Sequence, residues 1–331
     1  MPRAFRRTDW IIGLAVVAGT ALLTALGALR GVEGVAYDAA ARVSNGQEPA
    51  ADIVVVAIDD ASIERLGPWP WSRYTLGEIN ALIARGDPRT VGYALPLDTP
   101  QNEHARQTLE ELFEANRSAL GGDARRLFRR AIRDMGTDRV LAASFEHSGR
   151  VILGARFSAT AAPPRSVPGL PDAMAGSTIT AAQADGFRAT NLFRPGGLLH
   201  VARIHPPVDA LASSAAAVGA GPREAASAGT RRMLPLVLEH DDDWLAAFPL
   251  LVYAHAKGLR PADLQVIPGE GVRAGEHMFR TGRGLGVWPA YYDRQEDDRG
   301  PFRTVSAGAV HAREIDPSIF RDRVVLVGMT S

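Results

Sequence analysis

The chain has 331 residues, of which 46% are hydrophobic, so it can form one large domain or two with a sizeable core. Its 37 Lys and Arg residues balance its 37 Asp and Glu residues, which gives no support to nucleic-acid binding, because that function usually needs a basic surface. Cysteine is absent, which excludes disulfides, zinc–thiolate sites and a cysteine nucleophile.

The first thirty residues have the pattern of a membrane anchor. Arg3, Arg6 and Arg7 precede residues 10–29, which carry no charge and would form a helix about 30 Å long, the thickness of a bilayer core. We expect a cytoplasmic segment at residues 1–9 and a transmembrane helix in the lipid bilayer at residues 10–30, with the rest of the chain extracytoplasmic. A cleaved signal peptide is the alternative, because small residues crowd positions 25–28.

The same segment predicts an oligomer. Close helix contact is permitted by small residues at Gly13, Ala18, Gly19, Ala25 and Gly27. We therefore expect a homodimer that pairs through residues 10–45. The pattern of residues 31–51 predicts a helical extension followed by a polar linker.

Four apolar runs predict the central sheet. They occupy residues 53–58, 90–97, 150–154 and 323–328, are rich in β-branched residues and do not alternate with polar ones, as is typical of strands buried on both faces. We predict an α/β fold with a mostly parallel central sheet and flanking helices, built by the first and last parts of the chain. A helix that begins at Arg73 and is capped by Ser72 connects the first two strands, which should be parallel neighbours.

The middle of the chain is less regular. Residues 101–135 are charged and helical, and their basic run is expected to be a solvated face, with binding of anions or lipid headgroups as the alternative; it comprises Arg125, Arg126, Arg129, Arg130 and Arg133. Asp138 should cap the next short helix. We expect a long surface loop at residues 158–185, and a hairpin or strand-turn-helix where residues 231–238 and 244–248 flank three aspartates.

Polar and aromatic side chains follow the ends of the first two strands. Asp59 and Asp60 end the first strand and Asp98 ends the second, and ligands bind at this edge of parallel sheets. With these carboxylates, three residues of the intervening segment complete a candidate ligand-binding set: Trp69, Trp71 and Arg73. The set could hold a cation or a polar ligand against an apolar wall. Alternatively, an aspartate caps the following helix, the tryptophans fill the core and Arg73 pairs with one aspartate.

Other motifs predict no chemistry. Residues 239–243 are acidic but lack the spacing of a calcium loop, and His200 and His205 lack that of a helical zinc pair. The glycine-rich segment at residues 282–286 lacks the Lys and Ser/Thr of a phosphate loop, so a turn is expected. We accordingly predict no catalytic residue, no metal site and no cofactor.

Together these features resemble the second type of CHASE domain, an extracytoplasmic sensor of bacterial receptors. The resemblance rests on Asp59-Asp60, on Gly67-Pro68-Trp69-Pro70-Trp71-Ser72-Arg73 and on the closing segment at residues 315–328. Weaker matches are Tyr37-Asp38, Asp138 with Leu141-Ala142, Arg231-Arg232 with Pro235-Leu236, and residues 302–306. The second strand departs from the family, because Tyr93-Ala94 and Thr99-Pro100 replace its acidic positions, which puts part of a family ligand site in doubt.

The resemblance implies a function. Such a domain, here residues 31–331, detects an environmental signal through an unknown ligand and passes it across the bacterial inner membrane to a cyclase, diguanylate cyclase or kinase. That output is not in this sequence, and a buried strand so close to residue 331 suggests that the polypeptide is truncated or its gene continues. Two alternatives remain: a periplasmic metal-dependent hydrolase that uses Asp59, Asp60 and Asp98, and a non-catalytic assembly module.

Overall fold

The computed structural model describes residues 7–25, 50–160, 164, 166–179, 198–223, 233–241, 243–267, 269–290, 292 and 300–330. The chain divides into two units, which we consider separately. One contains helix α1 (Arg7–Ala25) and Trp288–Pro301, and the other contains Ala50–Val287 and Phe302–Ser331.

Helix α1 coincides with part of the predicted membrane span. Its first three residues, Arg7, Thr8 and Asp9, are polar, which shortens the apolar part of this 19-residue helix. Within the described ranges, no helix combines the length and the apolar character that crossing a bilayer requires. The span predicted over residues 10–30 is therefore not supported, and residues 26–30 and the extension at 31–49 lie outside the described residues.

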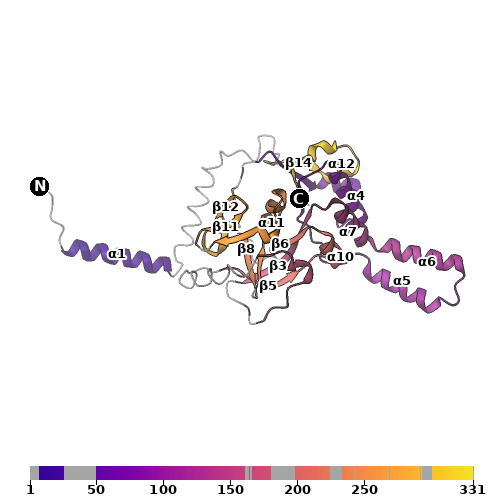
Figure 1. The fold of residues 1–331 in the computed structure, drawn as a ribbon, viewed down its shortest axis with the longest axis horizontal. Coiled ribbons are helices and arrows are strands. Elements are labelled where there is room, and N and C mark those ends of the chain that lie inside the picture. The colour runs from indigo at the N-terminus through magenta and orange to yellow at the C-terminus, as the bar shows by residue number, and fades with distance from the viewer. Residues whose placement is uncertain are drawn as a thin grey trace. The chain divides into compact units, whose positions relative to one another are not determined.

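The second unit is built on a largely parallel sheet (Figure 1). Among the described residues it has ten strands, in the order β14-β1-β15-β2-β3-β5-β8-β9-β4, with β6 also paired to β3. Their bounds are β1 Ile53–Ile58, β2 Thr90–Tyr93, β3 Val151–Thr160, β4 Thr178–Ile179, β5 His200–His205, β6 Ala217–Arg223, β8 Val237–His240, β9 Asp243–Ala246, β14 Arg303–Ser306 and β15 Val324–Met329. The predicted α/β class is confirmed, as is the joining of the first and last parts of the chain, because β14 and β15 flank β1 in parallel.

Helices cover both faces of the sheet. The helices of this unit that lie beside the sheet are α3 Asp60–Leu66, α4 Arg73–Ala84, α7 Thr137–Ser148, α8 Asp172–Ala175, α10 Asp209–Ser214, α11 Phe248–Ala256 and α12 Ala307–His311. Two more, α5 Glu103–Asn116 and α6 Gly122–Met135, extend away from it (Figure 1). Short 3-10 turns lie at Pro261–Asp263, Arg283–Leu285 and Pro317–Phe320. A smaller sheet contains β10 (Leu264–Ile267), β11 (Gly271–Ala274) and β12 (His277–Arg280). Another pairs β13 (Gly286–Val287) with β7 (Leu234–Pro235).

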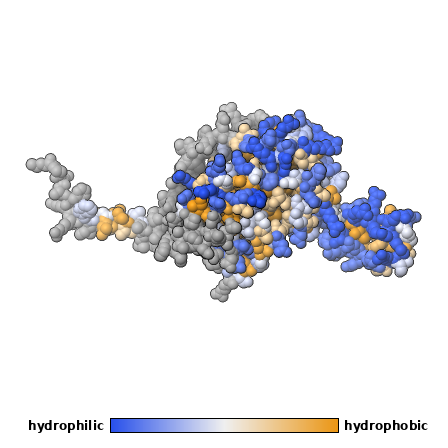
Figure 2. Space-filling view, viewed as in Figure 1, coloured by the Kyte–Doolittle hydropathy of each residue, from blue (hydrophilic) through white to orange (hydrophobic). Residues whose placement is uncertain are grey.

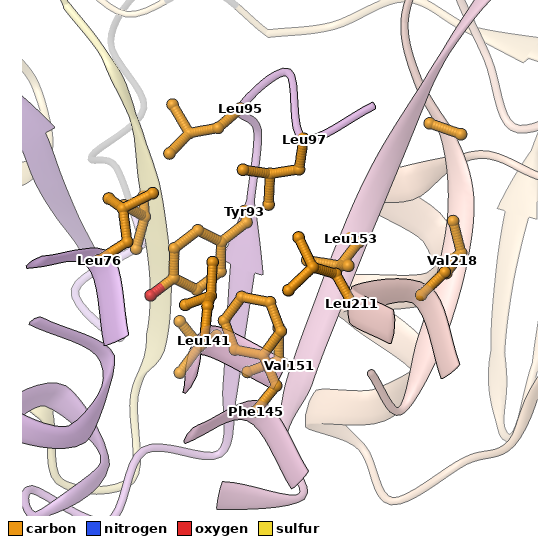
Figure 3. Packing of buried hydrophobic residues seen from close by; sticks show 14 of the residues in the cluster. Leu76, Tyr93, Leu95, Leu97, Leu141, Phe145, Val151, Leu153, Leu211 and Val218 are labelled. Carbon is orange, nitrogen blue, oxygen red and sulfur yellow. The ribbon is translucent and has the colours of Figure 1, made fainter. Parts of the chain in front are cut away.

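Buried apolar side chains fix these layers. On one face of β2, the Tyr93 ring lies 5.1 Å from that of Phe145 in α7, and both side chains are fully buried (Figure 3). On the other face, Gly92 leaves room for α11, since a Cβ atom there would lie 2.9 Å from the Phe248 ring. Successive residues of the buried strands therefore point to opposite faces of the sheet, and each face packs into its own hydrophobic core. Apolar runs that do not alternate with polar residues predict this arrangement.

Three predictions about this unit need correction. Strands β1 and β2 are not neighbours, because β15 lies between them and is parallel to both. The predicted loop at residues 158–185 instead begins with the end of β3 and contains α8 and β4, since these segments find partners in the sheet that local sequence does not reveal. Asp138 does not cap α7, because its carboxylate binds elsewhere.

Two local predictions are confirmed. Ser72 caps α4, with its hydroxyl accepting a hydrogen bond from the Tyr74 backbone N–H at 3.2 Å. The hairpin predicted around the acidic turn is formed by β8 and β9.

Candidate functional site

Asp59 lies at the carboxyl end of β1 and caps α3. One carboxylate oxygen accepts hydrogen bonds from the Ser62 backbone N–H at 2.9 Å, the Ser62 hydroxyl at 2.5 Å and the Ser306 hydroxyl at 2.8 Å. Burial raises the pKa of Asp59, but the hydrogen bonds from Ser62 and Ser306 lower it more, so that the net pKa lies below its usual range. Asp59 therefore holds α3 and β14 against β1 in its charged form.

Ser62 completes this contact. Its side chain is fully buried, and its oxygen accepts a hydrogen bond from the Gly308 backbone N–H at 2.9 Å. A Cβ atom at Gly308 would lie 3.0 Å from the Ser62 Cα atom, so α12 and α3 approach closely here. The carboxyl end of β1 is thus a packed joint between α3, β14 and α12.

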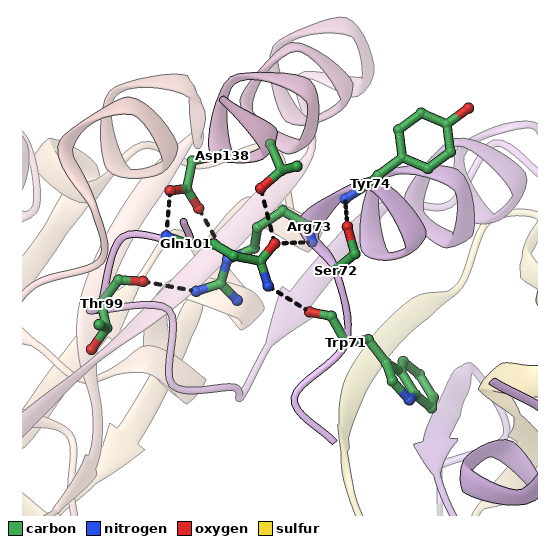
Figure 4. Close-up of polar contacts among 8 residues, drawn as sticks. Trp71, Ser72, Arg73, Tyr74, Thr99, Gln101 and Asp138 are labelled. Atoms are coloured by element: carbon green, nitrogen blue, oxygen red, sulfur yellow. Dashed lines mark hydrogen bonds and ion pairs between the residues drawn. The ribbon is translucent and has the colours of Figure 1, made fainter. Parts of the chain in front are cut away.

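Arg73 is the most deeply buried charge among the candidate residues. It is 6% exposed, and its Nε donates to Asp138 at 3.1 Å while Nη2 donates to the Thr99 carbonyl at 3.2 Å (Figure 4). The second oxygen of Asp138 accepts from the Gln101 backbone N–H at 2.8 Å. The aspartate that pairs with Arg73 is therefore Asp138, rather than Asp59, Asp60 or Asp98.

Gln101 ties this cluster to the segment before α4. Its side-chain oxygen accepts from the Arg73 backbone N–H at 2.7 Å and from the Thr137 hydroxyl at 2.9 Å, and its side-chain nitrogen donates to the Trp71 carbonyl at 3.1 Å. Gln101 lies two residues before α5, and Thr137 and Asp138 are the first two residues of α7, one residue beyond the end of α6. Arg73, Gln101 and Asp138, which we call the clamp, therefore close the base of the α5–α6 hairpin.

The two tryptophans lie beside the clamp. Trp71 is 4% exposed and donates its indole N–H to the Gly67 carbonyl at 2.8 Å, and its ring points away from the clamp (Figure 4). Trp69 is half-buried, and its ring packs edge-on against Trp71 with centroids 5.6 Å apart. Trp71 therefore belongs to the core, and Trp69 covers it from the solvent side.

The remaining candidate carboxylates lie in different surroundings. Asp60 is exposed at the first turn of α3. Asp98 is mostly buried and pairs with Arg156 of β3, a partner that sequence reasoning missed because the two residues are far apart along the chain. Among the described residues, no hydrogen bond or ion pair joins Asp59, Asp60 or Asp98 to another of the three.

A groove also lies between α4 and α7. It encloses about 740 Å³ and is lined in part by Tyr74, Glu78, His147 and Arg150. Tyr74, which follows Arg73, is 54% exposed at this groove. The groove was not predicted from the sequence, because it depends on how α4 and α7 pack and no local motif indicates it.

Metal binding finds no support in the described ranges. They contain no group of three or more His, Cys, Asp or Glu side chains that could hold a metal ion. His200 instead lies 3.4 Å from Glu239 across neighbouring strands. The geometry of the described residues therefore does not support the alternative of a metal-dependent hydrolase.

A comparison with protein families identifies the relationship. The sequence profile of the CHASE2 domain matches residues 12–331, which is nearly the whole chain. The chain belongs to the CHASE2 family. CHASE2 domains are sensory and extracellular, and they are generally non-catalytic. Comparisons with curated proteins and with solved structures found no match.

Membership confirms the resemblance drawn from the sequence motifs and gives them physical roles in this CHASE2 domain. Asp59 joins β1 to α3 and β14, and the tryptophan-proline segment leads to Arg73 in the clamp. Asp316 caps the last 3-10 turn by accepting from the Ser318 backbone N–H at 2.9 Å. The motifs that carry the resemblance are therefore mostly structural joints.

Proposed function

We propose that this chain is the extracytoplasmic sensory domain of a bacterial receptor, anchored in the inner membrane through residues 10–30. The CHASE2 match over nearly the whole chain carries this proposal. On this account the domain passes a conformational change to a cytoplasmic cyclase, diguanylate cyclase or kinase.

We further propose that the ligand binds at the carboxyl edge of the parallel strands, next to Asp60 and Trp69. Asp59, Arg73 and Asp98 are engaged by other residues, whereas Asp60 is exposed and Trp69 is half-buried. An exposed carboxylate and a partly exposed aromatic ring are side chains that suit a small polar or cationic ligand. The buried Trp71 and the clamp would then form a rigid floor below it.

Transmission requires two conformations that differ in ligand affinity. The clamp and the Asp59 joint connect this edge to α4, α7, α12 and β14, so a ligand that shifted α3 or the segment before α4 would move several elements together. A homodimer that pairs through residues 10–45 would carry such a shift across the membrane.

A ligand screen on the full chain tests this function. A ligand at about 100 times its Kd stabilises the folded state by about 2.7 kcal/mol, which raises the melting temperature by several degrees. We expect Asp60→Asn and Trp69→Ala to remove most of that rise, and Glu64→Gln, an exposed control on the same helix, to retain it. A ligand that stabilises the wild type and all three variants equally would place the site elsewhere. A screen that finds no stabilising compound would favour a non-catalytic assembly module.

A further inference from the structure

Helices α5 and α6 form a hairpin that extends away from the sheet (Figure 1). The two helices pack on each other through Phe113 and Phe128, whose ring centroids lie 5.9 Å apart. Phe113 is the buried residue of α5, and no residue of α6 is fully buried. Most of the hairpin surface is therefore open to solvent.

One side of the hairpin is apolar. Leu112 is 51% exposed and Leu127 is 68% exposed, and each directly precedes one of the two packed phenylalanines. Because the helices are antiparallel, one step back on each helix turns the side chain toward the same side of the hairpin. Ala105 and Ala131 extend this side, and Figure 2 shows hydrophobic atoms exposed on the otherwise hydrophilic hairpin.

The two helices carry opposite charge. Helix α5 has four glutamates against one arginine, a net charge of −3, and α6 has five arginines against two aspartates, a net charge of +3. The ion pairs recorded within these two helices are each formed inside one helix, as between Arg106 and Glu110 or Arg130 and Asp134. The hairpin thus offers an acidic helix and a basic helix side by side.

We propose that a second copy of this chain docks on this apolar side, so that two hairpins form a four-helix bundle. A two-fold axis parallel to the hairpin places α5 of one copy on α6 of the other, which brings acidic helix against basic helix and runs them antiparallel. The alternative two-fold axis would set like charges together. This interface is separate from the pairing proposed for residues 10–45 and does not depend on the sensory function.

The proposed geometry predicts specific neighbours. Because Phe113 and Phe128 lie at the same height, Leu112 of one copy faces Leu127 of the other. At the rim, Glu111 comes within reach of Arg130 of the other copy, as charged residues flank the seam of a coiled coil. Both Glu111 and Arg130 are exposed in the single chain.

Sedimentation of the full chain, in detergent if the N-terminal segment requires it, gives the first test. We expect a dimer at micromolar concentration, and an increase of at least about 100-fold in its Kd for Leu112→Glu or Leu127→Glu, because a carboxylate would be buried without a partner. Val140→Glu, at an exposed apolar position of α7, serves as the control and should leave the Kd unchanged. A monomeric wild-type chain, or a dimer unaffected by the leucine variants, would overturn the proposal.

Charge exchange and cross-linking test the orientation. Glu111→Arg and Arg130→Glu should each weaken the dimer about tenfold, and an equimolar mixture should restore it, because both rim contacts then pair opposite charges. Since the chain lacks cysteine, Leu112→Cys and Leu127→Cys introduce single thiols. A disulfide should form when these two variants are mixed and not with either alone; a disulfide in Leu112→Cys alone would overturn the proposed axis.

Discussion

Replacing Arg73 with methionine is expected to lower the free energy of unfolding by about 3–5 kcal/mol, because it leaves the Asp138 carboxylate buried without its counter-charge. The side chains of Arg73 and Asp138 are 7% and 13% exposed, so water cannot take over the role of the guanidinium. The variant also removes the bond to the Thr99 carbonyl. Urea unfolding of the full chain measures the change.

Two comparisons separate this effect from a general loss of an arginine. Arg89→Met breaks an ion pair with Asp52 whose side chains are 41% and 51% exposed, and should cost less than about 1 kcal/mol. Adding Asp138→Asn to Arg73→Met should recover part of the loss, since asparagine needs no counter-charge. If the two clamp substitutions destabilise additively, the buried pair is not the source of the effect.

Trp71→Ala is expected to lower the free energy of unfolding by about 3–5 kcal/mol, as large-to-small substitutions in a core do. The indole is almost fully buried, packs on Trp69 and loses its hydrogen bond to Gly67 in the variant. Thermal and urea unfolding should both report the loss.

Trp69→Ala provides the matched comparison. Its side chain is half-buried, so less apolar surface is lost and the destabilisation should be clearly smaller than for Trp71→Ala. Equal losses in the free energy of unfolding would show that both tryptophans are core residues. Trp69 would then not be available, together with Asp60, to bind a ligand.

Local pattern was enough to predict four adjacent strands at the centre of the sheet. The strands β1, β2, β3 and β15 follow from unbroken apolar runs, and the start of α4 follows from Ser72, because burial and capping depend on neighbouring residues. The order of the strands did not follow: β15 enters between β1 and β2 from the far end of the chain, and no local signal encodes that insertion.

The candidate site was predicted less well, for the same reason. Arg73 was expected to pair with one of the candidate aspartates, but its partner is Asp138, which lies 65 positions away and was predicted to be a helix cap. Asp98 was expected to share a ligand-binding set with Asp59 and Asp60, but it pairs with Arg156. Residues at strand ends share an edge of the sheet, but their side chains form hydrogen bonds and ion pairs with residues that only the tertiary fold brings near.

The side of the membrane on which the domain lies can be measured with reporter fusions. Alkaline phosphatase, which becomes active only outside the cytoplasm, would be fused after Ser331 of the full chain in bacteria. A green fluorescent protein fusion at the same position provides the complementary readout. For an anchored extracytoplasmic domain we expect an active phosphatase in the membrane fraction and a dark fluorescent fusion. An inactive phosphatase with a bright fluorescent fusion would place the domain in the cytoplasm and contradict the proposed extracytoplasmic sensor.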